Sequence, residues 1–273
     1  MALRTSRRVD DPLPWPALAL AALATVFFAL PLVGLVARAP WSDVTMILRG
    51  TEVRQTLRLS VICSVSATVL SVLLGLPLAW LLARGRRFPG QSLVRALCVL
   101  SMVLPPVVGG VALLFALGPG GLIGQWLDRW LHVRLPSTAA GAVVAQTFVA
   151  MPFFVVTVEA AVRRADAGHN DTARTLGASS WYSFRRVTLP GIRSALLAGA
   201  MLSWARAFGE FGATITFAGS FPGKTQTLPL SVYRALGTDP RQAIVLALLM
   251  VVVSIVVLVA LRGRWLGGGD PLL

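Results

Sequence analysis

Six stretches of about 20 mainly apolar residues constrain the fold of this chain more than any other feature. A transmembrane helix needs roughly 20 such residues at a rise of about 1.5 Å each. Only 13% of the residues are charged, whereas a soluble domain carries about 25%. We therefore predict an all-α integral membrane protein with about six transmembrane helices. The windows run over residues 16–37, 59–83, 93–117, 138–162, 194–218 and 243–261.

The distribution of lysine and arginine predicts the orientation of these spans. Basic residues are enriched in the cytoplasmic loops of membrane proteins. An inside N-terminus places 15 basic residues on the inner side and nine on the outer side, so we expect both termini to be cytoplasmic. The net charge of +14 is spread over these loops and forms no single basic face, so nucleic acid is not an expected partner.

Two prolines, Pro105 and Pro106, fall inside the third window. Proline lacks an amide donor, and its ring clashes with the preceding helical turn. We predict that the helix kinks or breaks here, with the freed carbonyl groups finding partners inside the protein. The kink is either a moving joint or a static bend that helps the helices to pack.

The fifth window contains two charged residues, Arg206 and Glu210. Charges inside a bilayer are costly, so both side chains should face protein or water. Their spacing of four places them on one helical face, where they can pair. Gly209, Phe211 and Gly212 complete the segment, and the glycines would let another helix approach closely. These five residues either shape or gate a path, with Arg206 attracting an anion, or the ion pair only fixes this helix.

The longest inner connection, residues 163–193, has the character of a docking element. Asp171 can cap a helix start. Trp181 and Phe184 are three residues apart and share one helical face. Pro190 suits the first turn of the next helix. A short helix that presents aromatic side chains toward the cytosol predicts a partner with a groove.

The spacing within this loop resembles the signature of permease subunits of ABC importers. That signature reads Glu-Ala-Ala, Gly and Ile-x-Leu-Pro, and Asp171, Gly177 and Val187 begin the corresponding elements here at the same spacing. Asp171 replaces Glu, Thr172 replaces Ala and Val187 replaces Ile. The resemblance implies a type I ABC importer permease fold, with coupling helices that dock on an ATPase subunit. The implied coupling residues are Asp171, Ala173, Gly177, Trp181, Phe184, Leu189 and Pro190.

Further segments resemble the molybdate and sulfate branch of this family. Residues 209–213 read Gly-Glu-Phe-Gly-Ala, and residues 222–229 and 103–110 look like the molybdate members. The resemblance implies molybdate import across a bacterial plasma membrane, with sulfate, thiosulfate or tungstate as alternatives. It covers residues 55–262, the expected permease core. Residues 1–54 would add a cytoplasmic N-terminus, the first span and an outer loop, and residues 263–273 a cytoplasmic tail.

The resemblance also implies the partners. Two copies of the chain would form the path within the lipid, and an extracytoplasmic molybdate-binding protein would deliver the anion. Two ATPase subunits, which hold ATP and Mg²⁺, would dock on residues 171–190. A secondary anion transporter, the rival of a different class, would leave the loop spacing unexplained.

The chain itself is not expected to be an enzyme or to hold a cofactor or metal. Residues 219–225 resemble a phosphate-binding loop, but they have three residues between the glycines where that motif needs four. Ala218 also occupies the position of the first glycine. His132 and His169 are isolated on opposite sides of the membrane, so neither indicates a metal or an acid–base pair.

Overall fold

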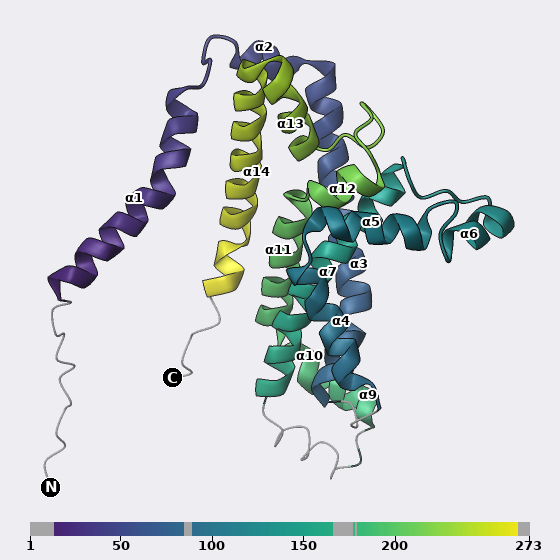
Figure 1. Cartoon of the computed structure of the whole chain (residues 1–273). Coiled ribbons are helices and arrows are strands. Elements are labelled where there is room, and N and C mark those ends of the chain that lie inside the picture. The colour runs from purple at the N-terminus through teal and green to yellow at the C-terminus, as the bar shows by residue number, and fades with distance from the viewer. Residues whose placement is uncertain (1–13, 85–88, 166–176, 178, 267–273) are drawn as a thin grey trace, which may run out of the picture.

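The computed structural model describes residues 14–84, 89–165, 177 and 179–266. Within these residues every regular element is a helix (Figure 1), which confirms the predicted all-α class. The elements are α1 (Trp15–Ala37), α2 (Val44–Arg49), α3 (Thr51–Arg84), α4 (Gln91–Val103), α5 (Pro106–Leu117), α6 (Gly124–Leu131), α7 (Ala139–Arg164), α9 (Ser180–Ser183), the π-helix η1 (Phe184–Thr188), α10 (Leu189–Gly191), α11 (Arg193–Phe208), α12 (Gly212–Phe217), α13 (Leu228–Thr238) and α14 (Pro240–Leu266).

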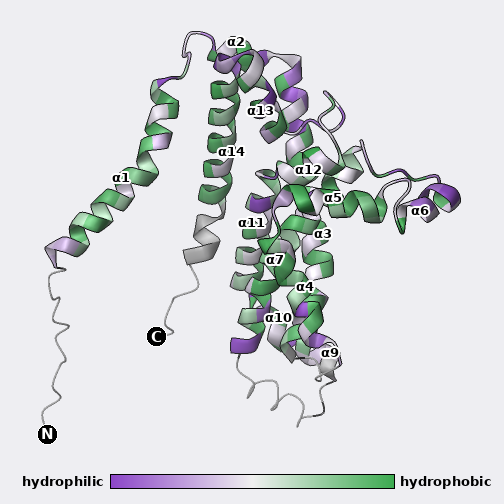
Figure 2. Ribbon diagram, in the orientation of Figure 1, coloured by the Kyte–Doolittle hydropathy of each residue, from purple (hydrophilic) through white to green (hydrophobic). Residues whose placement is uncertain are grey.

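Four of these helices, α1, α3, α7 and α14, are long and apolar enough to cross a membrane. They correspond to the first, second, fourth and sixth apolar windows. Figure 2 shows hydrophobic residues along most of their lengths. The chain is therefore a multi-pass membrane protein.

The third and fifth windows are each divided into two shorter helices. The third is α4 followed by α5, and the backbone is extended at Leu104 and Pro105, with ψ of 133° and 130°. The predicted break at the two prolines is confirmed. In Figure 1, α5 runs across the bundle and not along it. The fifth window is α11 followed by α12, with a break at residues 209–211 that contains no proline and was not predicted.

Small side chains lie at the centre of the bundle, where α3, α7 and α11 meet. Ala67, Ala150 and Ala207, one from each helix, are fully buried in one cluster. Lipid is as apolar as these side chains, so membrane helices associate through close packing, which small residues permit. Cys63 is buried in a similar cluster, and Cys98 packs at the edge of a larger one. Both cysteines therefore pack among apolar side chains.

Helix α1 stands apart from this bundle in Figure 1 and touches α14. None of its residues is buried, although its mean hydropathy is the second highest of the four spans at 2.4. An apolar helix of this length is stable when its surface faces hydrocarbon or another membrane helix. The exposed surface of α1 thus agrees with a membrane location.

Candidate functional site

The two helix breaks lie against each other. A Cβ atom built on Gly212, at the start of α12, would lie 2.9 Å from Cβ of Pro106, at the start of α5. One built on Gly110 would lie 2.7 Å from Cβ of Thr216 and 2.9 Å from the carbonyl oxygen of Ala213. The backbones of α5 and α12 therefore touch where only glycine fits. We call this junction, formed by Pro106, Gly110, Gly212, Ala213 and Thr216, the helix-break contact.

Glu210 connects α11 to α12 at this junction. Its Oε2 atom lies 2.6 Å from Nη1 of Arg206, which confirms the predicted pairing. Its Oε1 atom accepts a hydrogen bond of 2.7 Å from the amide of Ala213 in the first turn of α12, where negative charge is favoured. The Glu210 side chain is 1% exposed and that of Arg206 is 27% exposed. The carboxylate is thus fixed from both sides of the break.

The other two residues of the predicted segment have different surroundings. The ring of Phe211 lies 5.0 Å from that of Tyr233, so the break also contacts α13. A Cβ atom on Gly209 would meet only a carbonyl oxygen of its own helix, Ala205, at 3.5 Å. The expectation that glycine permits a close helix approach holds for Gly212 but not for Gly209.

We predict that Gly110→Ala destabilises the protein. Alanine normally favours a helix interior by about 1 kcal/mol over glycine. Here the added methyl group would press on Thr216 and Ala213, and overpacking costs about 1–3 kcal/mol. The midpoint of thermal unfolding in detergent should fall for Gly110→Ala and stay unchanged for the control Gly209→Ala. Equal midpoints would contradict a tight helix-break contact.

The docking segment of loop 163–193 is described from residue 179 onward and at Gly177, whereas Asp171 and Ala173 lie outside the described residues. The φ angle of Gly177 is +86°, in the left-handed region that favours glycine. Pro190 lies in the first turn of α10, directly after Leu189, as predicted.

Trp181 and Phe184 share one face, but only one of them is presented outward. Their rings stack with centroids 5.7 Å apart, and the ring of Phe184 also lies 4.7 Å from that of Trp80 on α3. Trp181 is 63% exposed, whereas Phe184 is 8% exposed. Phe184 therefore anchors the segment to α3, which corrects the expectation that both aromatic side chains face a partner.

The sequence did not predict one polar cluster, which lies near α9. Glu159 is buried, and its Oε1 atom pairs with Arg95 at 2.7 Å and Arg163 at 2.9 Å. The carbonyl oxygen of Leu82, in the last turn of α3, accepts from both arginines and from Gln91. Carbonyl groups at a helix end lack intrahelical donors, and these side chains supply them. The i,i+4 spacing of Glu159 and Arg163 was visible in the sequence, but Arg95 is 64 positions from Glu159.

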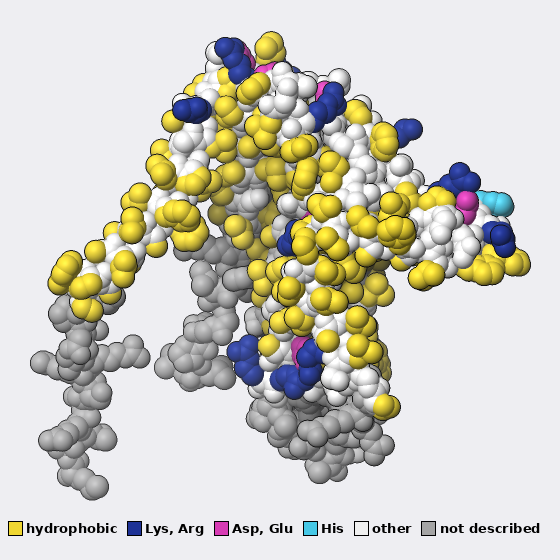
Figure 3. Space-filling view, in the orientation of Figure 1, with side chains coloured by type: hydrophobic (Ala, Val, Ile, Leu, Met, Phe, Trp, Pro, Cys, Tyr) yellow, Lys and Arg dark blue, Asp and Glu magenta, His cyan; other side chains and the backbone are white. Residues whose placement is uncertain are grey.

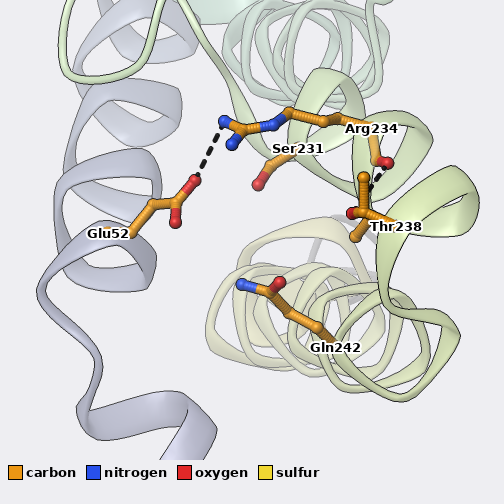
Figure 4. A pocket seen from close by; sticks show the side chains of 6 residues that line it. Glu52, Ser231, Arg234, Thr238 and Gln242 are labelled. Atoms are coloured by element: carbon orange, nitrogen blue, oxygen red, sulfur yellow. Dashed lines mark hydrogen bonds and ion pairs between the residues drawn. The ribbon is translucent and has the colours of Figure 1, made fainter.

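At the opposite end of the molecule, α3, α13 and α14 meet around a small cavity (Figure 4). Glu52 on α3 pairs with Arg234 on α13 at 3.2 Å, while Gln242 lines the cavity from α14. The volume is about 30 Å³, which is room for roughly one or two water molecules. This place is a polar joint between helices.

Comparisons with known proteins place the chain in a family. Residues 75–267 match the model of the family described as binding-protein-dependent transport system inner membrane component. The chain is 44% identical over 245 residues to the molybdenum transport system permease protein ModB of Mycobacterium tuberculosis, covering 90% of this chain and 92% of that protein. It is 39% identical to the sulfate transport system permease protein CysW of Synechocystis, covering 73% of each.

A solved structure shares the fold. A bacterial alginate ABC transporter in complex with an alginate pentasaccharide-bound periplasmic protein matches with a TM-score of 0.72 and 15% identity, over 92% of both chains. The family match includes both the helix-break contact and loop 163–193. This chain belongs to the family of binding-protein-dependent transport system inner membrane components.

Proposed function

We propose that this chain is the permease subunit of an ATP-driven importer that carries molybdate into the cell. The main support for this proposal is the 44% sequence identity to a molybdenum permease over 90% of the chain. Membership in a binding-protein-dependent family favours this class over a secondary anion transporter. ATP hydrolysis is then the work of a partner subunit, and this chain supplies the path.

The α9 end of the bundle is proposed to lie in the cytoplasm. The charged residues around it are mainly arginines, and basic residues are enriched on the cytoplasmic side. Arg95, Arg163 and Arg164 lie near this end, and Arg185 and Arg186 follow α9 directly. Both chain termini would then be cytoplasmic, and α2 and α13 would face the outside.

Loop 163–193 is the proposed contact with the ATPase. The segment α9–η1–α10 leads into α11, whose far end reaches Glu210 and the helix-break contact. A ligand shifts a conformational equilibrium only through its different affinity for the two states. The conformational change driven by ATP binding on the partner must therefore be transmitted to the path through a stiff element. Helix α11 is a continuous helix between the coupling segment and the helix-break contact.

The remaining partners are proposed from the family description and the shared fold. A second copy of the chain would complete the path, and an extracytoplasmic protein would deliver the anion to the α13 end. The alginate transporter, which holds a periplasmic protein, supports a partner of this type. The helix-break contact is our proposed gate, because two interrupted helices meet there at backbone distance.

Sulfate is the second candidate substrate, because a sulfate permease is 39% identical to this chain. Molybdate and sulfate are both tetrahedral dianions of similar shape. We expect a separate binding protein to make most of the distinction between them.

Uptake of labelled molybdate tests the proposal. Cells that keep the ATPase and binding protein should lose molybdate uptake when this chain is deleted and regain it when the chain is restored. Excess sulfate should compete weakly, whereas tungstate should compete well. Loss of sulfate uptake with unchanged molybdate uptake would assign the chain to sulfate instead.

A further inference from the structure

The segment between α5 and α7, residues 118–138, projects from the bundle as an arm that carries α6 (Figure 1). We call it the α6 arm. At 100° per residue, the apolar residues of α6 and its N-cap fall on one side of the helix and the polar residues on the other. The apolar side consists of Ile123, Trp126, Leu127, Trp130 and Leu131, and the polar side of Gln125, Asp128, Arg129 and His132.

The apolar side is uncovered by the described part of the chain. Ile123, Trp126, Trp130 and Leu131 are between 52% and 72% exposed. Four large apolar side chains on one short helix form a patch that water alone does not stabilise. Something outside the described chain must cover it.

The α6 arm is fixed to the bundle at both ends. Where it leaves α5, the amides of Leu122 and Ile123 donate to the carbonyl oxygens of Phe115 and Ala116 at 3.1 and 2.8 Å. Where it enters α7, the Thr138 hydroxyl donates to the carbonyl oxygen of Leu135 at 2.6 Å and accepts from the amide of Gly141 at 3.0 Å. The direction of the patch is therefore set by the fold.

Figure 3 shows how the two sides of the arm are directed. Charged side chains and the histidine lie along the edge that faces the same way as the α13 end of the molecule, and hydrophobic side chains lie along the opposite edge. The polar edge of the arm thus faces the same way as the α13 end of the bundle. The apolar edge faces the same way as the α9 end.

The chemistry of the patch matches a phospholipid surface. Tryptophan is enriched at membrane–water interfaces, where its ring meets the acyl boundary and its indole N–H meets the headgroups. The Arg129 guanidinium lies 5.8 Å from the centroid of the Trp126 ring, at the border between the two sides. Arg134 pairs with Asp128 at 2.9 Å and lowers the pKa of that carboxyl, so the polar edge keeps its charge. The two arginines outnumber the single carboxylate, which suits the phosphate groups of lipids.

We propose that α6 is an interfacial anchor that lies in the headgroup layer on the α13 side, with Trp126 and Trp130 at the acyl boundary. A helix with one apolar and one charged side lies in the plane of the membrane surface in this way. The anchor holds the outer end of α5, and with it one half of the helix-break contact, at a fixed depth. The proposal does not depend on which anion the protein carries.

Quenching of a fluorophore by lipids tests the anchor. A thiol-reactive fluorophore would be attached at Trp130→Cys, on the apolar side, and at the matched control Gln125→Cys, on the polar side. Both variants carry Cys63→Ala and Cys98→Ala and are studied as the full chain with its ATPase in nanodiscs. Lipids with a nitroxide on an upper acyl-chain carbon should quench position 130 several times more strongly than position 125. Aqueous iodide should show the opposite order.

Two outcomes would overturn the anchor. Protection of position 130 from both quenchers would mean that protein covers the patch, either a second copy of the chain or the binding protein. Strong iodide quenching at both positions would place the arm in water. Leu131→Cys provides a second apolar-side position if the label at position 130 disturbs the helix. Uptake assays do not enter this test, so it can fail while the proposed transport function holds.

Discussion

Replacing Trp181 with glutamate is expected to abolish ATP-driven uptake and leave the fold intact. Trp181 is 63% exposed on α9, so a charge at this position remains in water and costs the folded chain little. In the proposed complex the same side chain enters a groove of the ATPase, where a charge would be desolvated. Loss of a central aromatic anchor costs about 2 kcal/mol or more, which is roughly 30-fold in affinity. Co-purification of the ATPase with the permease measures this loss directly.

Two variants separate docking from stability. Trp41 is also 63% exposed but lies near α2 at the other end of the molecule, so Trp41→Glu should keep the ATPase bound. Phe184→Ala should act differently, because Phe184 is buried against Trp80 and its loss creates a cavity that costs about 3–5 kcal/mol. Its thermal midpoint should fall, whereas that of Trp181→Glu should not. Normal ATPase binding by Trp181→Glu would count against the coupling surface.

Glu210→Ala is expected to give the largest loss of stability of any single change at the helix breaks. It removes the partner of Arg206 and the acceptor of the Ala213 amide in one step. Removing one member of a buried ion pair costs about 3–5 kcal/mol, because the remaining charge is left uncompensated. We expect a lower thermal midpoint in detergent and little uptake, since the start of α12 loses its tie to α11.

The double variant Arg206→Ala/Glu210→Ala decides between the two roles considered for the pair. If the ion pair only fixes the helix, removing both charges leaves none uncompensated, and most of the stability and uptake should return. The structure favours this outcome, because the guanidinium is already neutralised by a carboxylate at 2.6 Å. A double variant that is stable but inactive would instead assign Arg206 a direct role toward the anion. Unchanged stability of Glu210→Ala would contradict the role of the ion pair in fixing the helix.

The sequence by itself determined those features that depend on local chemistry. A run of about 20 apolar residues predicts a membrane helix wherever it occurs, because the length and the solvent leave few other solutions. Pro105 and Pro106 predicted a break because two adjacent prolines remove two amide donors from the interior of one apolar window. The pairing of Arg206 with Glu210 followed from their spacing on one helical face.

Only the tertiary structure decided which residues meet across the bundle. Gly209 and Gly212 are equivalent in sequence terms, but only Gly212 faces another backbone, because the chain turns between them. Trp181 and Phe184 share a face, yet Trp80 on a distant helix buries one and leaves the other exposed. Glu159 forms an ion pair with Arg95, which lies on another helix 64 positions away in the sequence. Contacts of this kind depend on how whole helices pack, and the periodicity of a single helix carries no information about the helix it will face.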